Sequence, residues 1–325
     1  GQQVVLPAPG TSFARWASLL GEYAHRHEVV QLAQAWRQIA ALPTALPAVQ
    51  PAMDTYVSAG KHFAQLDVET SRMLLGEVPA AFHAGIHEIL LIAFALACAE
   101  FLGTGAAPIV IDVEGHGRQE ELAASGEHVD LSRTVGWFTT KYPVAITAGG
   151  LSWADVAAGD PRLGAVIKDA KEQLRALPDG LTYGVLRYLN GETDLDGSDP
   201  PIGFNYLGRL SAGTEVSDDV WGICEDGLSL IDASARLPMP LAHTVELNAS
   251  TVEAAAGPYL HAGWTWAPSA LDHAQVSRLS RLWFEALAGI CAHVRGGGGG
   301  LTPSDIAAGL SQQQIDELQR QYADS

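Results

Sequence analysis

The stretch AAFHAGIHEILLIAFALACAEFLGTGAAPIVIDV, residues Ala80 to Val113, decides the fold. It holds an apolar segment long enough for a buried helix, a glycine at position 103 that can end it, and then a short apolar run typical of a buried strand. We therefore expect one helix from about Ala80 to Phe101 and a strand over 108–113. A helix that leads into a buried strand indicates an α/β fold.

Apolar periodicity and turn residues predict further elements on both sides of this stretch. Expected strands cover 61–68, 144–147, 203–206, 241–252 and 259–266; expected helices cover 69–75, 162–177, 269–294 and 312–322, with two more within 11–41. The proline-rich segment 42–51 predicts a linker, and the glycine run 296–300 predicts a flexible spacer. The charged side chains of 162–177, Lys171 among them, are expected to form a solvated face.

Composition limits the class of protein. With 325 residues and 47% hydrophobic content, the chain can bury one large core or two smaller ones. Its 37 acidic and 19 basic residues give a net charge of −18, mostly dispersed along the sequence, which disfavours nucleic acid and anionic membranes as partners. Three distant cysteines, Cys98, Cys224 and Cys291, predict buried thiols in a reducing compartment. Without a signal-peptide pattern or a membrane-spanning run, we expect a cytoplasmic location.

The polar cluster EGHGR, Glu114 to Arg118, directly follows the expected buried strand. Strand ends are where ligands of α/β sheets tend to bind, and the two glycines allow a close approach of the backbone. Glu114 could act as a base, with His116 or Arg118 as its electrostatic partner. A solvated turn with an ordinary ion pair explains the cluster equally well.

Two further clusters contain aromatic and amide side chains beside glycines. In DLSRTVGWFTTKYP, residues 130–143, Trp137 and its neighbour Phe138 form either a hydrophobic plug, the interpretation favoured on general grounds, or the wall of a substrate channel. In GFNYLG, residues 203–208, Asn205 and Tyr206 either donate hydrogen bonds to a developing oxyanion or stabilise a turn.

A metal site is not predicted. His83 and His87 are four residues apart on the expected helix, but the order is not HExxH and no third ligand is nearby.

Taken together and in the same order, these segments resemble the epimerization domains of nonribosomal peptide synthetases, a branch of the condensation-domain superfamily. The matching segments are LPAPGTSFARWASLLGEYA (6–24), EGHGRQ (114–119), DLSRTVGWFTTKYPV (130–144), LTYGVLRYL (181–189), FNYLGRL (204–210) and LTPSD (301–305). They are spread over nearly the whole chain. The EGHGR and RTVGWFT elements are specific to the epimerization branch.

The resemblance implies a chloramphenicol-acetyltransferase-like α/β fold, a mixed β-sheet flanked by helices. It implies that a peptidyl carrier protein delivers an aminoacyl or peptidyl thioester on its phosphopantetheine arm, that no cofactor is bound directly, and that proton removal and return invert the α-carbon. Glu114 is similar to the glutamate that serves as one proton-transfer group, and Asn205 and Tyr206 match positions near the enolate oxygen. Trp137 would line the substrate tunnel, with His116 and Arg118 as further substrate-binding residues.

One departure from the family concerns its second proton-transfer group, the histidine of an HHxxxDG motif that lies N-terminal to LPAPGTSF. No HHxxxDG occurs in the 325 residues. We therefore expect residues 1–52 to trail a missing N-terminal lobe, 53–300 to form the C-terminal lobe, and 301–325 to form a tail with a short helix. The N-terminal lobe of the same synthetase would then be a required partner, and the chain would be inactive without it.

Two alternatives to this interpretation remain open. The first is a degenerate, non-catalytic module that docks a carrier protein or a neighbouring module. The second is a peptide-bond-forming condensation domain, although that branch does not usually carry EGHGR. A smaller departure is His87-Glu88, where the family usually has Asn-Asp.

Overall fold

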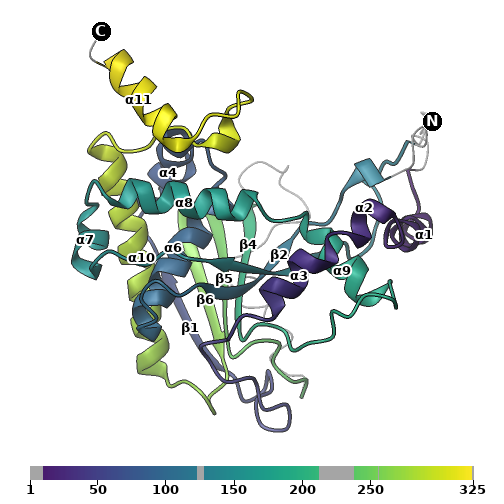
Figure 1. Ribbon diagram of the computed structural model, residues 1–325. Helices are drawn as coiled ribbons and strands as arrows, with labels where there is room; N and C mark the ends of the chain where they lie inside the picture. Colours follow the sequence, from purple (N-terminus) through teal and green to yellow (C-terminus); the bar gives the residue numbers. More distant parts are fainter. Residues whose placement is uncertain (1–9, 123–127, 212–237, 255, 324–325) are drawn as a thin grey trace, which may run out of the picture. The chain divides into compact units, whose positions relative to one another are not determined.

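The computed structural model describes residues 10–122, 128–211, 238–254 and 256–323. The chain divides into two compact units (Figure 1). The first unit comprises residues 1–42, 113–143 and 177–198, and the second comprises 43–112, 144–176 and 199–325. The boundary after Leu42 falls within the proline-rich segment that the sequence predicts as a linker.

The regular structure of the first unit is mainly helical and consists of α1 (Phe13–Tyr23), α2 (His27–Val30), α3 (Ala33–Ala40), α9 (Gly180–Tyr188) and the short η1 (Glu120–Leu122). Ser12 caps α1 by accepting a hydrogen bond from the backbone N–H of Arg15. In the core, Trp36 is fully buried, its Nε1 donates to Thr182 Oγ1 at 2.9 Å, and its ring meets Tyr183 edge-on at 5.3 Å. These contacts join α3 to α9.

A six-stranded sheet, most of which belongs to the second unit, has the strand order β1-β6-β5-β4-β2-β3. The strands are β1 (Gly60–Gln65), β2 (Ile109–Gly115), β3 (Thr140–Ile146), β4 (Ile202–Ser211), β5 (Val245–Glu253) and β6 (Tyr259–Trp266). Strands β4 and β5 are parallel, whereas β6 is antiparallel to both β5 and β1. The expectation of a mixed sheet flanked by helices is confirmed.

The helices of the second unit are α4 (Val68–Leu75), α5 (Glu77–Phe82), α6 (Ile86–Leu102), α7 (Trp153–Ala158), α8 (Leu163–Arg175), α10 (His273–Arg295), α11 (Gln312–Ala323) and the short η3 (Pro303–Asp305). Helices α6 and α10 cover one face of the sheet. Phe94 of α6 stacks on Phe204 of β4 at 5.5 Å, and Trp283 of α10 meets Trp264 of β6 edge-on at 6.3 Å.

The helix expected over Ala80–Phe101 is two helices, so that prediction was wrong at its N-terminal end. His83 adopts a left-handed conformation, with φ of 49°, and ends α5. Glu88 then accepts a hydrogen bond from the backbone N–H of Gly85 at 2.6 Å, which fixes a new helix start. Gly103, with φ of 65°, ends α6 as predicted.

Strand β4 extends beyond the expected 203–206 and passes through Gly208 instead of ending there. The pairing register with β5 shifts between Tyr206 and Arg209, and Gly208 within this bulge has a φ of 80° that only glycine adopts readily. The residue that predicted a strand end therefore marks a bulge.

The prediction of a flexible spacer at 296–300 was also wrong. The N–H of Gly298 donates to His293 O at 2.9 Å, and the N–H of Gly300 donates to Ala81 O at 2.8 Å. A Cβ added to Gly298 would lie 2.1 Å from Nε2 of His293. The run is a hydrogen-bonded turn, and at Gly298 and Gly299 the neighbouring atoms leave no room for a side chain.

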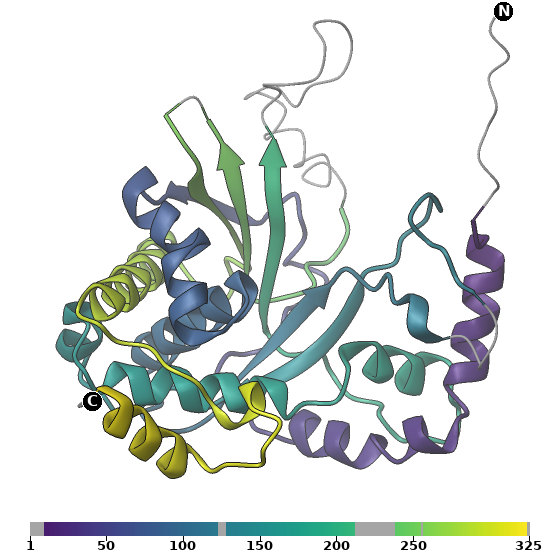
Figure 2. The same ribbon diagram turned by 90° about the horizontal axis from the view of Figure 1, so that it is seen from above.

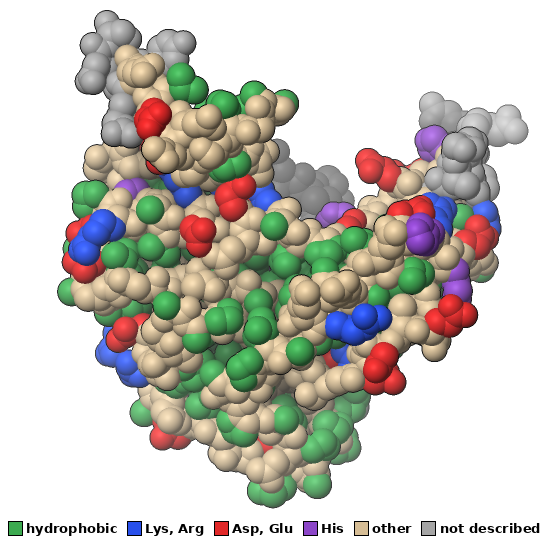
Figure 3. Space-filling view, in the orientation of Figure 1, with side chains coloured by type: hydrophobic (Ala, Val, Ile, Leu, Met, Phe, Trp, Pro, Cys, Tyr) green, Lys and Arg blue, Asp and Glu red, His purple; other side chains and the backbone are tan. Residues whose placement is uncertain are grey.

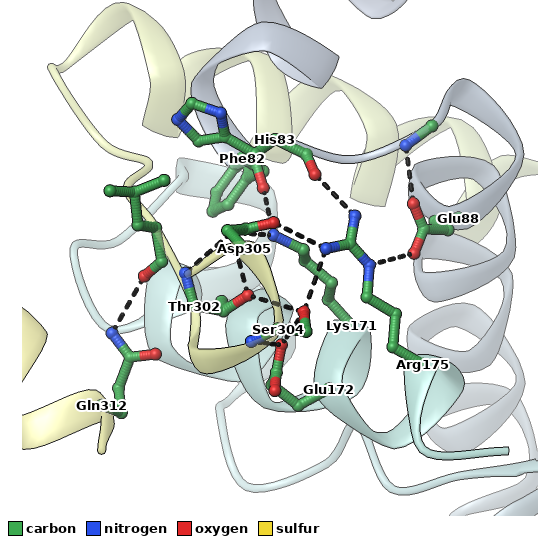
Figure 4. Close-up of polar contacts among 12 residues, drawn as sticks. Phe82, His83, Glu88, Lys171, Glu172, Arg175, Thr302, Ser304, Asp305 and Gln312 are labelled. Atoms are coloured by element: carbon green, nitrogen blue, oxygen red, sulfur yellow. Dashed lines mark hydrogen bonds and ion pairs between the residues drawn. The ribbon is translucent and has the colours of Figure 1, made fainter. Parts of the chain in front are cut away.

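Lys171 contradicts the expected solvated face of α8, because its side chain is fully buried. Its Nζ donates to Phe82 O at 2.7 Å and to Asp305 Oδ2 at 2.6 Å (Figure 4). Arg175, one turn further on, donates to the other oxygen of Asp305 at 2.6 Å and pairs with Glu88 at 3.0 Å. These contacts attach η3 to α8, and Figure 2 shows the C-terminal segment lying along that helix.

Burial disfavours the charged forms of both Lys171 and Asp305, but their hydrogen bonds offset this effect to different extents. Burial lowers the pKa of Lys171, and its hydrogen bond with Asp305 only partly offsets that effect. Burial on its own would raise the pKa of Asp305, but hydrogen bonds from Lys171, Thr302 and Arg175 outweigh it and lower that pKa. The carboxylate of Asp305 is therefore held in its charged form.

Cys98 and Cys291 are buried and unpaired with sulfur, which confirms the expectation for these two thiols. Burial raises the pKa of Cys291 to about 12. Cys224, like the LPAP residues that open the first matching segment, lies outside the described residues.

No helix in the described part of the chain is both long and apolar enough to cross a membrane by itself. The pair formed by residues 68–82 and 86–102 meets the criteria of length and composition only jointly, with a bend of 96°. On the face of the molecule shown in Figure 3, acidic and basic side chains are scattered among neutral ones.

Candidate active site

Glu114 is the last residue but one of β2, and its side chain is half-buried. The preceding residues, Ile109 to Val113, are all buried. The carboxylate therefore emerges where a buried strand reaches the surface, as the sequence predicts.

The turn after Glu114 is shaped by Gly117. Its φ of 63° lies in the left-handed region, and a Cβ there would lie 1.7 Å from the carbonyl oxygen of Phe138. No other residue fits this position without moving the backbone. His116 is exposed, and its Nδ1 accepts a hydrogen bond from the backbone N–H of Arg118 at 3.1 Å.

The guanidinium group of Arg118 connects this turn to the segment 130–143. It donates to Leu131 O at 2.5 Å and to Thr134 O at 3.1 Å, and it lies 4.1 Å from the centroid of the Phe138 ring. Arg118, predicted as a substrate-binding residue, thus uses several of its donors to hold the loop that precedes Trp137.

The two neighbouring aromatic residues of that loop have different environments. Phe138 is 7% exposed and meets the Phe13 ring edge-on at 5.3 Å, so Phe138 is a hydrophobic plug. Trp137 is 83% exposed, and Val135 beside it is 94% exposed. The plug interpretation therefore holds for Phe138, whereas the side chain of Trp137 is exposed and does not pack into the core.

Asn205 and Tyr206 are consecutive residues of β4 in unbroken register with β5, so their side chains leave opposite faces of the sheet. Tyr206 shares the helix-covered face with Phe204, and its hydroxyl group hydrogen-bonds to Thr251 Oγ1 at 2.8 Å. Asn205 is half-buried on the other face. The structure does not bring these two predicted neighbours together.

The predicted site residues fall in both units. Glu114, His116, Arg118 and Trp137 belong to the first unit, where the contacts of Arg118 link their two segments. Asn205 and Tyr206 belong to the second.

Sequence reasoning missed a charged cluster centred on His243, whose side chain is 5% exposed. Its Nε2 lies 2.9 Å from Asp112 Oδ2, and its Nδ1 lies 3.1 Å from Glu246 Oε2. The imidazole ring lies against Gly203, where an added Cβ would come within 2.5 Å of Nδ1. The signal in the sequence was Asp112, a carboxylate inside the apolar run PIVIDV.

The protonation state of His243 follows from its partners. Ionised carboxylates only accept hydrogen bonds, so both ring nitrogens must carry protons, and the ring is an imidazolium cation. Burial on its own would lower the pKa of His243, but the hydrogen bonds with Asp112 and Glu246 outweigh it and raise the pKa to about 9.

The two histidines considered as metal ligands lie on different helical segments. His83 ends α5, whereas His87 lies in α6 with its ring 5.6 Å from that of Phe204. Burial lowers the pKa of His87. Among the residues that the structure describes, no group of three or more His, Cys, Asp or Glu side chains is arranged to hold a metal ion.

The family follows from residues 1–235, which match the model of the condensation domain. The chain belongs to the condensation-domain family. Its fold is accordingly the α/β, chloramphenicol-acetyltransferase-like lobe that the sequence resemblance implies.

Curated relatives belong to peptide synthetases. The chain is 35% identical over 329 residues to one of the proteins that make up the linear gramicidin synthase of Brevibacillus parabrevis, in an alignment that covers 98% of this chain. It is 36% identical over 224 residues to surfactin synthase subunit 2 of Bacillus subtilis strain 168, in an alignment that covers 67% of this chain. The chain spans about 6% of the length of each of these proteins.

Solved structures share the fold of this chain. The crystal structure of the epimerization domain from the third module of tyrocidine synthetase B is 25% identical, with a TM-score of 0.70, over 91% of this chain and 63% of that one. The X-domain from teicoplanin biosynthesis, 17% identical with a TM-score of 0.57 over 86% of this chain and 59% of that one, shows a likeness of fold alone.

Proposed function

We propose that this chain is the C-terminal lobe of an epimerization domain, which inverts the α-carbon of an aminoacyl or peptidyl thioester held on a carrier protein. The observation that carries the proposal is the position of Glu114, a half-buried carboxylate at the end of a buried strand. The similarity to a solved epimerization domain and the EGHGR and RTVGWFT motifs support it.

In the proposed reaction, the carboxylate of Glu114 accepts the α-proton, and the electrons of the C–H bond pass into the thioester carbonyl to form an enolate. A proton then returns to the opposite face of the α-carbon from a second group. The family supplies that group as the histidine of HHxxxDG, which these 325 residues do not contain. The chain alone is therefore not expected to turn over.

Asn205 is proposed to donate a hydrogen bond to the enolate oxygen. A donor already aimed at the oxygen stabilises the charge that develops there, and such stabilisation is often the largest contribution to catalysis. Tyr206, which the resemblance assigns to the same oxygen, faces the other side of β4 and bonds to Thr251. We propose that its contribution is to support the strand.

Exchange of the α-proton in deuterated solvent tests the proposal, with this chain joined to an N-terminal lobe that carries HHxxxDG and with an N-acylated aminoacyl thioester on a phosphopantetheine carrier. Glu114→Gln should lower the exchange rate by roughly a hundredfold or more, the usual contribution of a general acid–base group. Glu121→Gln, an exposed glutamate a few residues away, is the matched control and should exchange normally.

Unchanged deuterium uptake in Glu114→Gln would remove this carboxylate from the mechanism. No exchange in the wild-type protein, together with binding of the loaded carrier, would instead favour the alternative of a non-catalytic module that docks a carrier protein. Formation of a peptide bond without exchange would identify a condensing domain.

A further inference from the structure

Strand β1 lies at one edge of the six-stranded sheet (Figure 1), and among the described strands it pairs with β6 alone. Directly after β1, the backbone N–H of Leu66 donates to Leu260 O at 2.9 Å, so these two residues form a hydrogen-bonded pair. Hydrogen-bonded pairs alternate along antiparallel strands, so the backbone groups of Ala64 also face β6. Those of Phe63 and Gln65 point away from β6, toward the outer edge.

This edge lacks most of the features that keep exposed strands from pairing. Natural edge strands are protected by proline, by a bulge or by charged side chains. The sequence of β1, GKHFAQ, contains no proline and a single lysine, and its register with β6 runs without a shift. Phe63 is 61% exposed, and Gln65 is exposed as well. The outer edge of β1 is therefore suited to pairing with another strand.

The Phe63 ring leaves the outer backbone of β1 accessible, because it leans over the neighbouring strand. It stacks on His261 of β6 at 5.9 Å, and its Cε1 lies 3.4 Å from where a Cβ on Gly263 would stand. An incoming strand can thus reach the N–H and C=O groups of Phe63 from the outer side.

The charge at this edge suits an acidic partner, and the chain itself is acidic. Strands β1 and β6 contain no Asp or Glu, whereas the whole chain carries 37 acidic residues and a net charge of −18. The carboxylates next in sequence, Asp67 and Asp272, lie outside both strands. Repulsion between two copies of an acidic protein is reduced where the facing segments lack carboxylates.

A second copy of β1 fits the edge in an antiparallel register centred on Phe63. In that register Phe63 faces its own counterpart, and Lys61 faces Gln65 of the other copy, so that no like charges are directly opposite. Each Phe63 donates one backbone hydrogen bond and accepts another, because its N–H and C=O groups point outward in both copies. The two strands are then related by a two-fold axis, as in most homodimers.

We propose that β1 is a homodimerisation edge, at which two copies of this chain pair through Phe63 and join their sheets. The contact is a single pair of strands, and small interfaces are transient. The dimer is therefore weak, with a dissociation constant on the order of 100 μM, and it forms more readily when salt screens the net charges. The inference does not depend on the proposed reaction, because no substrate takes part.

Sedimentation velocity measures this association, with the same two-lobe protein as in the exchange assay. The weight-average sedimentation coefficient of the wild type should rise between about a tenth of the expected dissociation constant and about three times it. Phe63→Lys places two like charges directly opposite each other in the dimer and should keep the protein monomeric. Tyr188→Lys adds the same charge at another exposed aromatic residue, on α9, and should associate as the wild type does.

Cysteine cross-linking tests the register. Cys98 and Cys291 are buried, and Cys224→Ser is introduced in every variant. In Phe63→Cys the new thiols meet at a hydrogen-bonded pair, whose Cα atoms are about 5.5 Å apart, and an oxidant should give a covalent dimer. In Gln65→Cys the Cα atoms of the two new cysteines lie about 14 Å apart along the strands, so no disulfide should form.

Thermal melts establish that each variant is folded. A wild type that stays monomeric over the whole concentration range would overturn the proposal, as would association that Phe63→Lys leaves unchanged. Equal cross-linking of Phe63→Cys and Gln65→Cys would reject the pairing through Phe63. These results are independent of α-proton exchange, so the dimer and the epimerase proposal can fail separately.

Discussion

At the scale of single residues, the buried imidazolium is the feature with the clearest consequence. The folded-state pKa of His243 is raised to about 9 from an ordinary value of 6.5. A raised pKa means that the stabilisation is fully present below about pH 6.5 and is lost as the pH rises through 9. The difference between the two values corresponds to stability on the order of 3 kcal/mol.

We predict that the free energy of unfolding of the wild type exceeds that of His243→Gln at pH 6, and that the gap narrows steadily up to pH 9. Urea denaturation at several pH values measures it. His25→Gln changes an exposed histidine, and its free energy of unfolding should follow that of the wild type at every pH. A gap that stays constant with pH would mean that His243 is neutral in the folded protein.

At the scale of elements, the attachment of η3 to α8 depends on one buried ion pair. Lys171→Met leaves Asp305 without its fully buried cation, although Arg175 remains. We predict a loss of about 3 kcal/mol in the free energy of unfolding, the lower part of the range for breaking a buried pair. Lys168→Met removes a half-exposed pair with Asp316 from the same helix and should cost about 1 kcal/mol or less. Similar losses of unfolding free energy in both variants would show that the buried pair stabilises the fold no more than the half-exposed one.

Sequence reasoning located β6 to the residue and α6 to its glycine end, because strand alternation and a C-terminal glycine are local signals. It also placed Glu114 at a strand end. It missed the packing of the glycine run and the burial of Lys171, since each depends on a partner far away in the sequence, as with Lys171 and Asp305. It also missed the break before α6, because a left-handed conformation at a histidine is uncommon. Pairing Asn205 with Tyr206 failed to consider the alternation of side chains along a strand.

At the scale of the whole molecule, the net charge of −18 governs long-range behaviour. At pH 7 and low salt we predict that the protein passes through a heparin column and is retained by an anion exchanger, because its field repels polyanions. Retention on heparin at about 50 mM salt would reveal a local basic surface strong enough to overcome the net charge.

The hydrogen-bonded turn at 296–300 bears on how such modules can be recombined. A glycine run invites use as a crossover point between two synthetases, yet a chimaera joined there would inherit η3 from one parent and α8 from the other. Unless both parents share the lysine and the aspartate, the hybrid would bury one charged group without its partner. A junction placed beyond α11 keeps both halves of the contact from a single parent.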